Sequence, residues 1–294
     1  MRNIHIISAL FLLFFSACAL LRPYDDLASD AEAALEAGDK AQALTHYDAL
    51  IAAYHEDDER APGAVYQQAG LLAYAMDDTS KSIDYLEQAR HTSAANAETY
   101  ETLAKAYREI DNLSREITML EHYVENYPGT DAYQAMQYRL FETLEESRNY
   151  EQALALWDEL EGEPQEDEGM MTVYLQVLQS LDREKEAVET AEDLLELNED
   201  NLEALDFLAK RHFNQAVALY NREMQAYEDN RTHRQYAQLL DALEVVNTDL
   251  RIALNYFKQL YEQDPRSEYA SYIANIYERF QDEEKARYYR NRAQ

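Results

Sequence analysis

The sequence contains one cysteine, Cys18, among 294 residues. A single thiol cannot form a disulfide within the chain, so a disulfide-stapled fold is excluded. It also cannot supply the thiolate cluster of a structural zinc site. Any role of Cys18 must therefore depend on the residues around it.

Glycine and proline are also scarce, with six and five residues. All five prolines lie where the apolar pattern of the chain breaks, at Pro23, Pro62, Pro128, Pro164 and Pro265. Because a proline inside a helix costs roughly 3 kcal/mol, this placement predicts an all-helical protein. The six glycines include no phosphate-binding run of the P-loop kind.

Positive charge is the third deficit, because 26 Lys and Arg face 58 Asp and Glu, for a net charge of −32. Such a surface repels phosphate backbones and anionic headgroups, so we expect no nucleic-acid partner and no membrane docking by surface charge. The preferred protein partner should present a neutral or basic surface. A hydrophobic content of 47%, with 24 Tyr and 8 Phe, predicts a folded chain rather than a disordered acidic one.

The sequence shows no arrangement typical of catalysis or of cofactor binding. No two of the seven histidines stand three or four residues apart, as a metal-binding pair on a helix requires. No Gly-x-Ser-x-Gly nucleophile elbow occurs. The densest acidic run, residues 161–168, lacks the ligand spacing of a calcium loop and is interpreted as a solvated loop. We therefore predict no enzyme activity, no metal and no cofactor.

The first 17 residues have the organisation of an export signal. Arg2 gives a positive start, residues 6–15 form an apolar run, and two small residues stand directly before Cys18. The tetrapeptide Phe15-Ser16-Ala17-Cys18 resembles a bacterial lipobox, with Phe15 where leucine is usual. The resemblance implies that the chain is cleaved before Cys18 and that this cysteine carries lipid.

A lipoprotein of this kind would have a signal peptide over residues 1–17 and a lipidated tether over 18–23. Ala19 follows the cysteine, in place of the aspartate that retains many lipoproteins in the inner membrane. The resemblance thus implies an anchor in the outer membrane, with the protein facing the periplasm. Two alternatives stay open: Ala17-Cys18-Ala19 also fits an ordinary signal-peptidase site, and residues 4–21 are just long enough to remain as an uncleaved anchor.

A small residue recurs along the chain, followed by an apolar residue in helical register. Its positions are 43, 82, 116, 153, 187, 253 and 286, with steps of 39, 34, 37, 34, 66 and 33, and 66 is two steps of 33. In the third copy Tyr100, Leu103, Ala104 and Tyr107 form one helical stripe, and Pro128 ends the unit. This pattern resembles the tetratricopeptide repeat (TPR), a helix–turn–helix unit of about 34 residues.

The resemblance covers roughly residues 24–294 and implies an all-α fold, a right-handed α-solenoid of about seven TPR-like units. We expect repeats 1–5 over 24–200. Over 201–294 we expect two long helices, Leu202 to Tyr227 and His233 to Tyr261, and further C-terminal repeats.

Small residues are expected where paired helices cross, because they allow close approach. The first-helix residues of this kind are Ala31, Gly70, Ala104, Ala209 and Ala274, and the second-helix residues are Ala43, Ser82, Ala153, Ala187, Ala253 and Ala286. Glu116, Phe141 and Leu175 depart from the pattern.

In TPR proteins the concave groove is lined by first-helix residues that face away from the second helix. Carried over by their offset from the small residue, these positions are Gln67, Tyr74, Glu101, Lys105, Arg108, Tyr138, Glu142, Glu145, Gln176 and Gln179. Such a mixture of tyrosines, amides and charges suits an extended peptide or a partner helix, with a solvated inner wall as the alternative. It does not match the Lys/Asn/Arg clamp of chaperone-associated members, so a C-terminal carboxylate ligand is disfavoured.

Together these features predict a membrane-tethered scaffold that binds proteins of an outer-membrane assembly, secretion or maintenance complex. The alternative is a ligand-recognition lipoprotein that holds a peptide or a glycan in its groove. Copurification from detergent extracts of the envelope separates them, because the first predicts a stable protein partner and the second a lone protein that retains a small ligand.

Cys18 is predicted to carry the lipid, because it is the only cysteine and follows two small residues directly. Cells grown with a palmitate analogue should label the wild-type protein and not the Cys18→Ser variant. Label that persists in the variant would contradict the lipoprotein assignment.

Overall fold

The computed structural model describes residues 23–293, and every regular element in this range is a helix. The chain divides into two compact units, Met1–Asn112 and Leu113–Gln294. The predicted signal peptide, Cys18 and residues 19–22 of the predicted tether lie outside the described residues. Within 23–293, none of the helices combines the length and the apolar character that crossing a bilayer requires.

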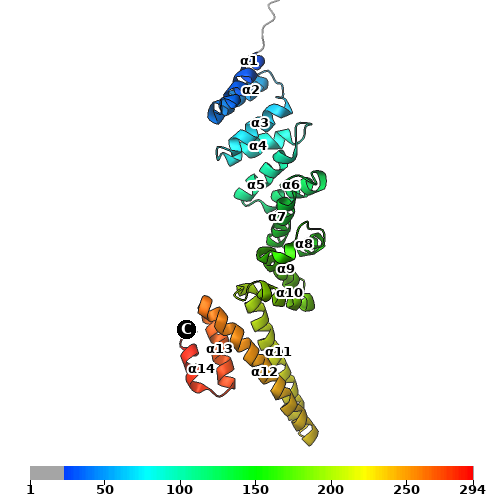
Figure 1. The fold of residues 1–294 in the computed structure, drawn as a ribbon, viewed down its shortest axis with the longest axis vertical. Helices are drawn as coiled ribbons and strands as arrows, with labels where there is room; N and C mark the ends of the chain where they lie inside the picture. The colour runs from blue at the N-terminus through cyan, green and yellow to red at the C-terminus, as the bar shows by residue number, and fades with distance from the viewer. Residues whose placement is uncertain (1–22, 294) are drawn as a thin grey trace, which may run out of the picture. The chain divides into compact units, whose positions relative to one another are not determined.

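The described part of the first unit consists of five helices (Figure 1): α1 (Pro23–Glu36), α2 (Lys40–Glu56), α3 (Gly63–Tyr74), α4 (Thr79–Ala89) and α5 (Ala97–Glu109). The described part of the second unit contains α6 (Leu113–Asn126), α7 (Tyr133–Glu146), α8 (Tyr150–Trp157), the short 3₁₀ helix η1 (Pro164–Glu166), α9 (Glu168–Ser180), α10 (Glu184–Leu197), α11 (Leu202–Asp229), α12 (His233–Gln263), α13 (Ser267–Arg279) and α14 (Glu283–Arg290). The helices pack as successive hairpins, α1 with α2, α3 with α4, α7 with α8, α9 with α10, α11 with α12 and α13 with α14.

This arrangement confirms the predicted all-α fold of TPR-like helix pairs. It also confirms the two long helices, since α11 has 28 residues and α12 has 31. The predicted division of the chain at residues 200/201 stays a prediction.

Six of the turns inside the pairs repeat one backbone conformation, and the turn between α11 and α12 differs from them. Each of the six has a residue in the left-handed region, with φ between 54° and 77°, at Gly38, Asp77, Asp111, Arg148, Asp182 and Gln281. The N–H of the next residue donates to the carbonyl five residues before it, as from Asp78 to Ala73 at 2.9 Å and from Arg183 to Leu178 at 2.9 Å. This bond satisfies a carbonyl at the helix end and reverses the chain. Each left-handed residue stands five positions before the small-residue position of the repeat, which is occupied by Glu116 after Asp111, so the turns and the sequence pattern share one register.

The predicted small residues are buried where paired helices cross. All of the alanines among them are between 0% and 3% exposed, as is Ser82. At Gly70 on α3 even a methyl group is too large, because a Cβ there would lie 2.6 Å from Cγ of Leu86 on α4. Close packing at these points is therefore confirmed.

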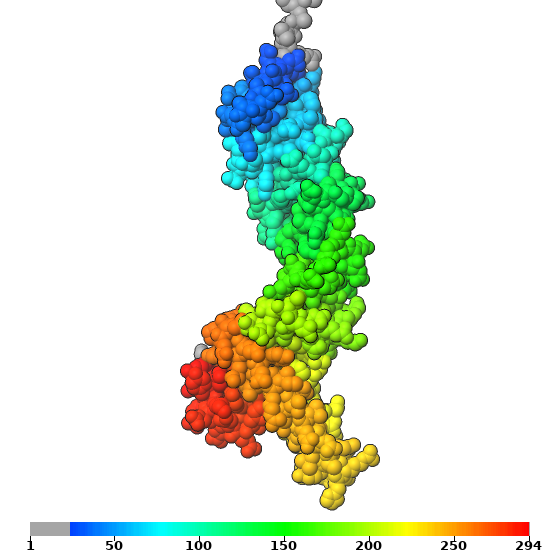
Figure 2. Space-filling model, viewed as in Figure 1, coloured from blue at the N-terminus to red at the C-terminus, as the bar shows by residue number. Residues whose placement is uncertain are grey.

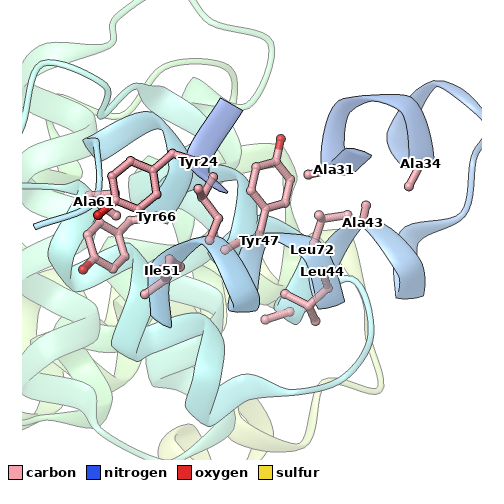
Figure 3. Close-up of a cluster of buried hydrophobic side chains, with 14 residues drawn as sticks. Tyr24, Ala31, Ala34, Ala43, Leu44, Tyr47, Ile51, Ala61, Tyr66 and Leu72 are labelled. Carbon is pink, nitrogen blue, oxygen red and sulfur yellow. The ribbon is translucent and has the colours of Figure 1, made fainter. Parts of the chain in front are cut away.

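Aromatic residues fill space both within the helix pairs and between them. In the first unit Tyr24 of α1, a member of the buried cluster that Figure 3 shows, stacks within its pair on Tyr54 of α2 with ring centroids 4.0 Å apart. In the second unit Phe257 of α12 stacks on Tyr272 of α13 at 4.4 Å. Burial of these large rings supplies much of the hydrophobic stabilisation of each unit.

Ala153 on α8 tests the role of the small residues, because it is fully buried, while Ala155 on the same helix is exposed. Ala153→Leu should overpack the contact and lower the free energy of unfolding by about 1–3 kcal/mol, whereas Ala155→Leu should change it little. Because repeat units are stabilised by their neighbours, urea unfolding of Ala153→Leu should also broaden or split into phases. Equal stability of the two variants would mean that the repeat register is misplaced.

Candidate functional site

In the first unit, the predicted groove residues lie on the neighbouring helices α3 and α5. Gln67 of α3 is only 7% exposed, and its Nε2 donates to Oγ1 of Thr99 on α5 at 2.9 Å. Its amide therefore joins two helices and offers little surface to a partner. The hydroxyl of Tyr74 donates to Oε1 of Glu109 at 2.8 Å, and burial together with this carboxylate raises the pKa of Tyr74 to about 12.

The charged residues predicted on α5 also have local partners. Lys105 Nζ lies 2.6 Å from Oε1 of Glu101, one helical turn earlier. Arg108 is half-buried on the same helix. The first unit thus presents Tyr74, Glu101, Lys105 and Arg108 as a partly exposed polar surface.

A hollow of about 610 Å³ also lies in the first unit. It is lined by His55, Asp58, Glu59, Arg60, Tyr66, Asp84, Tyr85 and Gln88, and it contains none of the predicted groove residues. Its side chains bond to one another, with His55 Nε2 and the Tyr66 hydroxyl 2.9 Å apart. Arg60 donates to the Gln88 backbone carbonyl and to its side-chain oxygen, both at 2.9 Å.

In the second unit, three predicted residues lie on α7 and two on α9. Tyr138 is half-buried, and its hydroxyl accepts from Gln134 Nε2 at 3.1 Å. Glu142 forms an ion pair with Arg139 Nη1 at 3.0 Å. Gln176 is half-buried on α9.

Arg139 also neutralises a buried carboxylate. Glu116 of α6 is 1% exposed, and its Oε1 accepts from Arg139 Nε at 2.7 Å and from Thr143 Oγ1 at 3.2 Å. Glu116 occupies the position where most repeats have a small residue, so the α6–α7 contact depends on a charge pair where others depend on close packing. The same guanidinium contacts Glu142, and the buried pair therefore also positions a predicted groove residue.

The remaining two predicted residues converge with α11. Gln179 of α9 donates from Nε2 to Oε1 of Glu203 on α11 at 3.3 Å. Burial raises the pKa of Glu145 on α7, and the charges of Glu146 and Glu203 raise it further. The first helices of three consecutive pairs, α7, α9 and α11, therefore bring polar side chains into one neighbourhood.

Beside Gln179 lies a hollow of about 480 Å³, which we call the α9–α11 hollow. It is lined by Gln179, Glu184, Asp206, Phe207, Lys210, Arg211, Asn214, Gln215 and Ala218. Lys210 Nζ lies 2.9 Å from Asp206 and 3.1 Å from Glu268. Burial opposes the charge on Lys210, but its bonds to these two carboxylates raise its pKa above the usual value. Arg211 Nε lies 3.1 Å from Glu184.

Eight of the nine residues lining this hollow were missed by sequence reasoning. Asp206 and Lys210 stand at the same offsets from Ala209 as Glu101 and Lys105 do from Ala104. Because α11 is longer than a repeat helix, these offsets do not by themselves predict that its residues face a groove. Phe207, Asn214 and Ala218 carry no such signal in sequence, since they line the hollow only through the way α11 packs on α9.

Within residues 23–293, no group of three or more His, Cys, Asp or Glu side chains is arranged to hold a metal ion. No protein-family model matches the sequence, and no curated protein matches it.

Among solved structures, the chain resembles the C-terminal part of a TPR repeat-containing protein from Cytophaga hutchinsonii, with a TM-score of 0.54 and 14% identity over 90% of this chain and 92% of that one. It also aligns with YrrB, described as a TPR protein with an unusual peptide-binding site, at a TM-score of 0.48 and 13% identity over 61% of this chain and 89% of that one. A tetratricopeptide repeat protein from Parabacteroides merdae aligns at 0.43 and 12% over 92% and 91%. The first of these likenesses agrees with the TPR-like fold and is too distant to carry more than the fold.

Arg139 is predicted to be essential for stability because it pairs with the buried carboxylate of Glu116. Arg139→Ala should lower the free energy of unfolding by about 3–5 kcal/mol, since it leaves Glu116 buried without its guanidinium. The double variant Glu116→Ala/Arg139→Ala should lose much less, because alanine suits this position in other repeats. Denaturant unfolding of both variants and of Glu116→Ala completes the cycle. Additive losses would show that the two side chains act independently.

Proposed function

We propose that this protein is a lipid-anchored scaffold of the cell envelope that binds protein partners within an outer-membrane assembly, secretion or maintenance complex. The observation that carries the proposal is the convergence of Gln179 from α9 with Asp206 and Lys210 from α11 in the α9–α11 hollow. First helices of consecutive repeats form a continuous surface, and such surfaces suit extended peptides or helices.

The chemistry of the hollow favours a protein segment as the ligand. Its cations, Lys210 and Arg211, each contact carboxylates of the protein itself. The amide nitrogens of Gln179 and Gln215 donate to Glu203 and Glu184, each at 3.3 Å, so their amide oxygens, the amide of Asn214 and the ring of Phe207 remain for a partner. Amides can donate and accept hydrogen bonds with a peptide backbone, while an aromatic ring supplies apolar contact.

The electrostatics near the hollow favour a neutral or basic partner. Burial raises the pKa of Glu145 on α7, and the charges of Glu146 and Glu203 raise it further, so carboxylates there repel one another. A cationic group of a partner placed there would relieve this repulsion and lower the pKa again. With −32 on the whole chain, the long-range field also attracts basic surfaces.

A photo-crosslinking residue at position 179 tests whether the hollow contacts a partner. The matched control is position 185 on α10, where the side chain of Lys185 is 87% exposed. In cells, position 179 should crosslink a defined envelope protein and position 185 should not. A variant that retains a small peptide or glycan and crosslinks no protein would favour the ligand-recognition alternative.

Binding rates of the captured partner then separate packing from charge. Phe207→Ala should raise the dissociation rate constant by about 10-fold, because it removes an apolar contact inside the hollow. Added salt should mainly lower the association rate constant, since surface charges act over a Debye length of about 8 Å at physiological salt. Unchanged rates in Phe207→Ala would show that the partner binds elsewhere.

A further inference from the structure

The hairpin of α11 and α12 is longer than the helices that pack against it. In Figure 2 its tip, in yellow, projects past α13 and α14. Helix α13 ends at Arg279, and the guanidinium of this residue lies 3.6 Å from the centre of the Tyr220 ring on α11. A hollow of about 410 Å³ at this end is lined by Val217 of α11 and Leu250 of α12, among others.

Beyond that point the hairpin keeps an apolar face that these helices do not cover. On α12 the residues Leu243, Leu240 and Tyr236 continue the face of Leu250 toward the tip at spacings of seven, three and four. On α11 Met224 stands seven residues beyond Val217 on the same face. We call Val217, Met224, Tyr236, Leu240 and Leu243 the distal strip. Val217 is 36% exposed, Tyr236 49% and Leu240 46%.

The distal strip lies in a weakly charged part of a strongly acidic chain. Between Val217 and Leu243 three arginines, at positions 222, 231 and 234, face four acidic residues, at 223, 228, 229 and 241, for a net charge of −1. The chain as a whole carries −32. A body of the same negative charge therefore meets less repulsion at this tip than a uniformly charged surface would present.

We propose that the distal strip binds the distal strip of a second copy of this chain, so that two hairpins form an antiparallel four-helix bundle. The strip continues the face on which α13 already packs, so it has the form of a helix-binding surface. A second copy offers helices of the same length and a complementary apolar strip, as a two-fold interface requires. The weakly charged tip lets the bundle form while the acidic remainder of each chain stays outside it.

The size of the strip predicts a weak dimer. The uncovered part of α12 extends for about 20 Å at 1.5 Å per residue, which places the contact at the small end of protein interfaces. Association should therefore depend on protein concentration, and it should be highest where a membrane anchor confines the chains.

Two copies of the full chain with different tags, coexpressed in cells, provide the test. A photo-crosslinking residue at position 240 should yield a product that contains both tags. The matched control is position 245, because Val245 is 52% exposed on the same helix and stands nine residues from Tyr236, which places it on the opposite side. We expect about 10-fold less two-tag product from position 245. Equal yields at both positions, or a product from position 240 with lipid or with another protein only, would overturn the proposal.

Salt gives a second readout with a definite sign. In isolated membranes, raising NaCl from about 50 mM to about 500 mM should increase the two-tag product, because it screens the repulsion between two acidic chains. A decrease would overturn the proposal, since it would indicate a contact held by opposite charges. For the basic partner proposed at the α9–α11 hollow, the salt dependence has the opposite sign.

A charge-neutral substitution then assigns the contact to the strip. With the crosslinker at position 240, Tyr236→Gln should lower the two-tag product by about 10-fold, because it removes apolar surface from the interface. Val245→Gln, which removes an equally exposed apolar residue on the other side, should leave the yield unchanged. Equal effects of the two substitutions would contradict the proposed face. Crosslinking from position 179 is expected to be unaffected by either variant, so failure of the dimer and failure of the scaffold are distinguishable.

Discussion

The close approach of two helices at a small residue is the contact on which the described structure depends. Ala153 and Ala187 are fully buried, and at Gly70 a methyl group would already collide with Leu86. The turn just before the second helix determines where this contact falls, because its left-handed residue ends one helix and reverses the chain. A turn of fixed length followed by a small residue brings the same faces together in five of the pairs; Glu116 replaces the small residue after α5, and the turn between α11 and α12 has no left-handed residue. Aromatic rings then fill the wider space between successive pairs.

The distribution of charge also depends on how the helices pack. With 26 basic residues for 58 acidic ones, many carboxylates must remain at the surface. Several of the cations are engaged inside the protein, where Arg139 neutralises Glu116, Lys81 contacts Asp48, and Lys210 lies between Asp206 and Glu268. These pairs hold helices together and leave the outer field negative. The partner surface that we propose, neutral or basic, follows from how the fold uses its few positive charges.

The second unit carries two surfaces of different chemistry. The α9–α11 hollow is lined by amides, paired charges and one aromatic ring, and it lies on first helices in the manner of TPR-like arrays. The distal strip is apolar and stands on the long hairpin, where it begins on α11 at Val217, next in sequence to Ala218 of the hollow but about 100° around the helix. The two surfaces suit different partners. We propose a basic protein for the polar α9–α11 hollow and a second copy of the chain for the apolar distal strip. Both proposals depend on α11, whose first half lines the hollow and whose second half leads to the tip.

The repeat register, the helix pairs and the two long helices were predictable from the sequence, because each depends on short-range signals. Each signal is only a few residues long. The signals are the small residue of each repeat, the proline at each break, and the lack of breakers from Leu202 onward. By contrast, offset alone gave Gln67 and Gln179 the same predicted role. Only packing showed that the first bonds to Thr99 in the interior while the second borders the α9–α11 hollow.

The amino-acid sequence by itself thus determined the class of fold, the acidic field and the bounds of the two long helices to within about two residues. Propensity, turn chemistry and net charge are properties of short segments or of composition. Tertiary structure alone decided which polar side chains are exposed, that Arg139 rather than another cation meets Glu116, and that α13 ends where Tyr220 and Leu250 lie. The physical reason is that burial and pairing are set by neighbours from other helices, often about one repeat away along the chain. A local sequence pattern therefore does not predict which side chain of a neighbouring helix will contact a given residue.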